Sequence, residues 1–118
     1  MYLSDTPALC ALEILVHADA SQLRASYVLI PLDAPDDVSR TMVDVAKLPP
    51  DWRDSPAPPA LQVLGDAWLA AGATALLAVP SAIAPPQLNF VLNPAHPDAR
   101  RCVTGASQAW RFDPRLKR

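Results

Sequence analysis

The spacing of hydrophobic residues predicts two amphipathic helices separated by short apolar strands. A polar stretch at residues 4–6 is placed to cap a helix with Pro7 in its first turn, and a broad apolar face carries that helix to about His17. A second helix is expected over residues 60–71, closed by Gly72. Apolar and β-branched runs predict strands at residues 2–3, 24–32, 41–45, 75–79, 88–92 and 102–112. Strands mixed with two helices, and gathered late in the chain, indicate an α+β (mixed α/β) fold in which helices flank a compact sheet.

Length and composition describe one globular domain spanning residues 1–118. Hydrophobic residues make up 51% of the chain, and 14 prolines against 3 glycines place the longest loop at residues 47–59. Ten basic and 12 acidic residues give a net charge of -2, which offers no reason to expect direct binding of nucleic acid. No apolar run is long enough to span a membrane, and the first residues lack the features of a signal peptide, so we expect a cytoplasmic protein.

The two cysteines, Cys10 and Cys102, form no CxxC pair and have no histidine at metal-ligand spacing. We therefore expect reduced thiols and no metal site. The chain also contains no GxGxxG, Walker A or GxSxG motif, so none of the usual nucleotide-binding or hydrolase signatures applies.

Glu13 is the first candidate for chemistry, because it interrupts an otherwise apolar helix. With Cys10 and His17 it forms a stripe at i, i+3 and i+4 spacing. Periodicity favours a solvent-facing surface for this stripe, but a carboxylate at the wall of a pocket has the same spacing. Periodicity leaves both interpretations open.

Ser81 and Asn89 are the next candidates. Ser81 follows a buried strand, where it either forms a turn or directs its hydroxyl at a ligand. Asn89 shares a strand face with Asn93, and these amides either shape turns or contact a ribose or an amide. His96, between two prolines, is expected to be structural, and the three tryptophans are expected to anchor the core.

Five blocks in fixed order resemble the RES domain family. The first runs from Tyr2 through the helix that carries Glu13 to His17. The others are residues 48–53 (LPPDWR), 64–69 (LGDAWL), 79–82 (VPSA) with 89–97 (NFVLNPAHP), and 112–116 (FDPRL). Together they extend over essentially the whole chain.

This resemblance implies a fold similar to ADP-ribosyltransferase toxins of the diphtheria-toxin type. It implies a toxin that cleaves NAD or transfers ADP-ribose, paired with an Xre-type helix-turn-helix antitoxin. NAD is then the substrate and no metal is required. By the same resemblance, Glu13 takes the place of the family's catalytic glutamate, Ser81 that of its serine and Tyr2 that of its pocket tyrosine, and Asn89 is a further polar contact.

One family feature has no counterpart here. The family's arginine lies in a Gly-Arg-Trp segment upstream of the tyrosine strand, whereas Tyr2 is the second residue of this chain. We expect an N-terminally truncated domain with weak or absent turnover, because the pyrophosphate of NAD needs a cation, ideally a guanidinium. The alternative is an inactive RES remnant that only binds its antitoxin.

Overall fold

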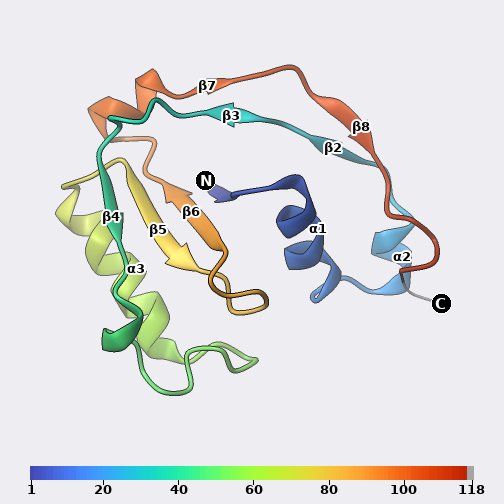
Figure 1. Ribbon diagram of the computed structural model, residues 1–118, viewed down its shortest axis with the longest axis horizontal. Coiled ribbons are helices and arrows are strands. Elements are labelled where there is room, and N and C mark those ends of the chain that lie inside the picture. Colours follow the sequence, from blue (N-terminus) through green and yellow to red (C-terminus); the bar gives the residue numbers. More distant parts are fainter. Residues whose placement is uncertain (117–118) are drawn as a thin grey trace.

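A four-stranded mixed sheet forms the centre of the computed structural model, which describes residues 1–116. Its strand order is β1–β6–β5–β4, with β4 parallel to β5 and the other pairs antiparallel (Figure 1). The strands are β1 (Tyr2–Ser4), β4 (Arg40–Met42), β5 (Leu76–Pro80) and β6 (Leu88–Leu92). This mixture of strands and helices confirms the α+β class predicted from the sequence.

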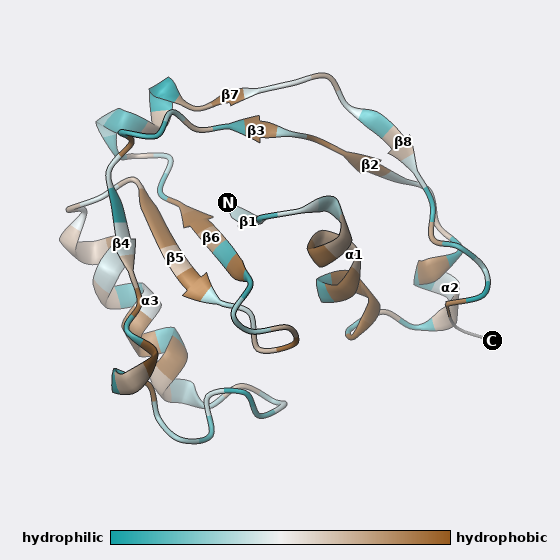
Figure 2. Ribbon diagram, in the orientation of Figure 1, coloured by the Kyte–Doolittle hydropathy of each residue, from teal (hydrophilic) through white to brown (hydrophobic). Residues whose placement is uncertain are grey.

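The strand register sorts side chains onto two faces of this sheet. Ser4 lies opposite Asn89, and Tyr2 lies opposite Val91. Directly opposed residues project to the same side, so Tyr2, Ser4 and Asn89 share one face. The opposite face is apolar and supplies Leu92 to the main core, where it packs with Val38 from the turn before β4. The coloured ribbon shows β5 and β6 as largely hydrophobic strands (Figure 2).

Within residues 1–116, three α-helices and two short 3-10 helices accompany the strands: α1 (Pro7–Leu15), α2 (Ala20–Leu23), α3 (Pro59–Ala71), η1 (Val45–Lys47) and η2 (Pro97–Arg101). Thr6 caps α1 by accepting a hydrogen bond from the Leu9 N–H at 3.1 Å. Gly72 ends α3 in the left-handed region with φ of 61°, as its sequence position predicted. None of the helices among residues 1–116 is long and apolar enough to cross a membrane.

A two-stranded ribbon extends beyond the sheet (Figure 1). Its paired segments are β2 (Tyr27–Leu29) with β8 (Gln108–Trp110), and β3 (Leu32–Asp33) with β7 (Val103–Thr104). A second, smaller core ties this ribbon to α2, because Leu23 packs with Ala18 and Phe112.

Several predicted boundaries shift in the structure. The single strand expected at residues 24–32 is two strands, because Pro31 has no N–H for a continuous ladder and only its carbonyl is bonded, to the Gly105 N–H at 2.8 Å. The strand expected at 102–112 is likewise divided into β7 and β8. Helix α1 ends at Leu15 rather than at His17.

Candidate active site

Glu13 lies in the last turn of α1 and faces the sheet. It is four residues after Leu9, which is buried, and residues at i and i+4 share a helix face. The Glu13 side chain is half-buried. Of the two interpretations left open by the helical pattern, the structure therefore places this carboxylate against the protein interior, while His17 is exposed.

Two buried side chains hold the Glu13 carboxylate by the same oxygen. The Ser81 hydroxyl donates to Oε1 at 2.9 Å, and Asn89 Nδ2 donates to Oε1 at 2.7 Å. Hydrogen bonds to an ionised acceptor are about twice as strong as those between neutral groups. Among residues 1–116 no donor reaches the other oxygen, Oε2. One oxygen is thus fixed, and the second accepts no hydrogen bond from these residues.

Asn89 is itself held from the other side. Its Oδ1 accepts a hydrogen bond from the Ser4 hydroxyl at 2.7 Å, and the Asn89 side chain is 1% exposed. Sequence reasoning did not single out Ser4. The sequence signal for Ser4 was weak. Asn89 is the one polar residue of β6, but which residue of β1 lies opposite it depends on strand register.

Tyr2 joins this network from β1. Partial burial and the negative charge of Glu13 raise the pKa of the Tyr2 hydroxyl, while a side-chain hydrogen bond with Asn89 opposes that rise without cancelling it. The phenol therefore stays neutral well above physiological pH. Since Tyr2 as a whole remains 59% exposed, the hydroxyl approaches the carboxylate while much of the residue stays open to solvent.

Ser81 has the turn-forming role considered for it from the sequence, and its hydroxyl also bonds Glu13. Its Oγ accepts the Ile83 and Ala84 N–H groups, each at 3.2 Å, which shapes the turn after β5. The same hydroxyl donates its proton to Glu13. The turn after β5 therefore orients the Ser81 hydroxyl toward Glu13.

The other polar candidates have local structural roles. Asn93 Oδ1 accepts the Ala95 N–H at 3.1 Å, and His96 Nδ1 accepts the Asp98 N–H at 3.0 Å at the start of η2. These bonds agree with the turn-forming role considered for Asn93 and with the structural role expected of His96. Asn93 therefore does not share the contacts of Asn89, although both side chains are buried.

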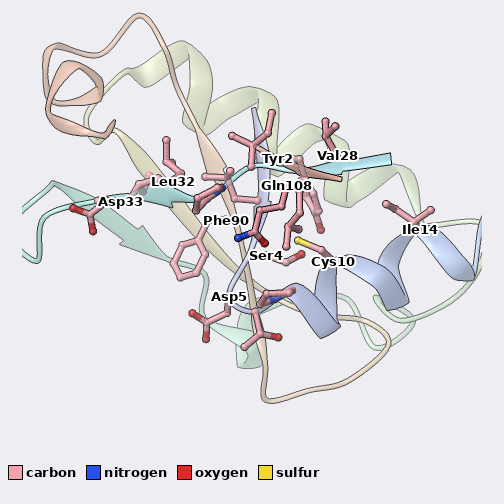
Figure 3. Close-up of a pocket in the computed structure, with 18 of the residues that line it drawn as sticks. Tyr2, Ser4, Asp5, Cys10, Ile14, Val28, Leu32, Asp33, Phe90 and Gln108 are labelled. Atoms are coloured by element: carbon pink, nitrogen blue, oxygen red, sulfur yellow. The ribbon is translucent and has the colours of Figure 1, made fainter. Parts of the chain in front are cut away.

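A hollow of about 720 Å³ adjoins this network. Residues of β1 and α1 line one side, and the β2–β3 segment of the ribbon lines the other. Figure 3 shows Tyr2, Ser4 and Cys10 among the lining side chains. Glu13 and Asn89 do not line the hollow, so the carboxylate network meets it through Tyr2 and Ser4.

The chemistry available here is that of one oriented carboxylate among neutral hydrogen-bonding groups. Residues 1–116 contain no cluster of three or more histidine, cysteine, aspartate or glutamate side chains placed to hold a metal. A fixed negative charge next to neutral groups suits stabilisation of a developing positive charge.

Replacing Ser81 with alanine is expected to lower the free energy of unfolding by about 1–3 kcal/mol. The change removes a donor to Glu13 and leaves two turn N–H groups without their acceptor, the fully buried Ser81 hydroxyl. Urea denaturation measures the effect, and the exposed Ser107→Ala serves as the control. Equal midpoints for the two variants would show that the Ser81 hydroxyl contributes nothing to the turn.

Comparison with known proteins gives consistent similarities. The RES domain matches residues 1–114. The chain is similar to a protein named Prs ADP-ribosylating toxin from Sphingobium sp. (strain YBL2), with 35% identity over all of this chain and 74% of that protein. It is 31% identical to a protein named Toxin Res from Yersinia enterocolitica, over 99% of this chain and 77% of the relative. A Toxin Res from Pseudomonas putida is 34% identical over 85% of this chain and 68% of its own length.

Proposed function

Because this chain belongs to the RES domain family, we propose that it is a toxin that cleaves the nicotinamide–ribose bond of NAD, with Glu13 as the catalytic carboxylate. The observation that carries the proposal is the placement of Glu13, which is held on one oxygen by Ser81 and Asn89 beside the Tyr2 hydroxyl. An ADP-ribosylating relative supports the choice of substrate, since ADP-ribose is what remains of NAD once nicotinamide leaves.

In the proposed reaction, the bond between the ribose C1′ and the nicotinamide nitrogen breaks, and its electron pair leaves with nicotinamide. Positive charge builds on the ribose, as in glycoside hydrolysis. We propose that Oε2 of Glu13, which accepts no hydrogen bond within residues 1–116, stabilises that charge or accepts a hydrogen bond from a ribose hydroxyl. An acceptor then attacks C1′ and releases a proton. Water, phosphate and a protein side chain are all chemically competent acceptors.

The neighbouring residues support this role in different ways. The Tyr2 phenol is neutral and partly exposed to solvent, which suits contact with the nicotinamide ring. Ser81 and Asn89 are proposed as polar residues of the NAD site. In the structure their donors already hold Glu13, so their first effect is on the carboxylate itself.

Binding of the NAD pyrophosphate is expected to be weak. Among residues 1–116, the hollow is lined by three acidic side chains, Asp5, Asp33 and Asp36, and by one cation, Arg40. The Arg40 guanidinium already donates to backbone carbonyls that include that of Asp36 at 3.3 Å. An acidic lining repels an anion, and a cation with prior partners attracts it less. Weak binding of NAD favours low turnover. It also supports the alternative, in which a RES chain binds an antitoxin without cleaving NAD.

The proposed partner is an Xre-type helix-turn-helix antitoxin, and the proposed compartment is the cytoplasm, where NAD is the available substrate. Relatives named as toxins support such a pairing, because a cell that makes a toxin must restrain it. Co-purification of a small helix-turn-helix protein with the tagged chain tests this partner directly.

The purified chain is expected to release nicotinamide slowly from millimolar NAD. Liquid chromatography of the reaction over several hours measures the product, and boiled protein gives the background. Release above background supports the enzyme. Release no faster than the boiled control contradicts it and leaves the antitoxin-binding alternative.

A further inference from the structure

We propose that Ser4 is a positioning residue that orients Glu13 through Asn89. This inference rests on the proposed NAD cleavage for its kinetic consequences, but not for its structural ones. Three side chains form the line: the Ser4 hydroxyl donates to Asn89 Oδ1 at 2.7 Å, and Asn89 Nδ2 donates to Glu13 Oε1 at 2.7 Å.

The two ends of the Asn89 amide are not interchangeable. Its carbonyl oxygen can only accept, and its nitrogen can only donate. Ser4 occupies the oxygen from β1, and Glu13 occupies the nitrogen from α1, so rotation of the amide would break both bonds. Because Asn89 is 1% exposed, water cannot replace either partner cheaply.

Strand register makes the Ser4 contact specific. Ser4 is directly opposite Asn89 in the β1–β6 pair, so their side chains stand on the same face at close range. Hydrogen bonds in series also polarise one another, and the Ser4 donation makes the Asn89 N–H a stronger donor to Glu13. Ser4 thus acts on the Glu13 carboxylate through two hydrogen bonds in series.

Ser4 is also the member of this line that reaches the hollow. It lines that space, whereas Asn89 and Glu13 do not. Residue 4 therefore lies between the hollow and the carboxylate network.

The kinetic test compares Ser4→Ala with wild type in the nicotinamide-release assay. We expect kcat to fall about five- to tenfold, as the loss of one hydrogen bond implies, with KM little changed. Ser4→Thr keeps a hydroxyl and should restore most of kcat, and the exposed Ser107→Ala should match wild type. Wild-type kinetics in Ser4→Ala, with wild-type release intact, would overturn the positioning role and leave the proposed function standing.

A second measurement does not depend on NAD cleavage. Ser4→Ala, Glu13→Ala and the double variant are compared by urea unfolding, because alanine at position 13 removes the acceptor for the Asn89 amide. Residues in one hydrogen-bond network show non-additive effects on unfolding free energy, whereas independent residues add. We expect non-additivity in this background and additivity when Asn89 is replaced by alanine. Additive effects with Asn89 present would refute the inference, whether or not the wild-type chain cleaves NAD.

Discussion

Replacing Glu13 with glutamine is expected to lower nicotinamide release from NAD by about 10²–10⁴-fold. Glutamine keeps the size of the side chain and an oxygen that can still accept from Ser81 and Asn89, so the fold should persist. What it loses is the negative charge that opposes the positive charge on the ribose. Glu13 is the only glutamate of the chain, so no neighbouring glutamate can substitute for it.

The control for this experiment is Asp66→Asn, which makes the same change of charge on the exposed surface of α3. It should leave release unchanged. Circular dichroism on both variants verifies that they fold. Equal rates for Glu13→Gln and wild type, both above the boiled-protein background, would remove Glu13 from the mechanism.

Replacing Asn89 with aspartate is expected to destabilise the protein at pH 7 by on the order of 3 kcal/mol, an effect that reverses as the pH falls. The change places a second carboxylate within hydrogen-bond distance of Glu13, at a position that is 1% exposed. Two such carboxylates cannot both ionise, so the pair must retain a proton in the folded state.

The sign of the pH effect follows from this shared proton. The pKa of one carboxyl of the folded pair rises above the value of about 3.9 for an unfolded aspartate. The penalty is therefore absent below that pH and grows as the pH rises. Melting temperatures of Asn89→Asp should increase from pH 7 to pH 5.

The stability of the wild-type protein should instead decrease in strong acid. Hydrogen bonds from the Ser39 backbone N–H and hydroxyl lower the pKa of Asp98, so that group stabilises the fold at neutral pH and this contribution fades in strong acid. Asn93→Asp is the matched control for Asn89→Asp, because an aspartate there keeps the acceptor for the Ala95 N–H. A melting temperature of Asn89→Asp that does not respond to pH, or one that follows Asn93→Asp, would contradict the proximity of residue 89 to Glu13.

The elements with local signals were predictable from the sequence. The cap and Pro7 mark the start of α1, and Gly72 marks the end of α3, because capping and left-handed termination depend on residues within one turn. The apolar run of β6 was likewise evident. Resemblance to the RES domain added the family and drew attention to Glu13 and Ser81.

The site itself was decided by tertiary structure. The helical pattern left Glu13 facing either solvent or a pocket, and burial of Leu9 on the same helix face turns it toward the protein interior. The hydrogen bonds that hold Glu13 join residues 68 and 76 positions apart, and the Ser4 bond to Asn89 spans 85. Such contacts depend on the register of strands that meet only after folding, and a shift of one residue would turn Ser4 to the other face of the sheet.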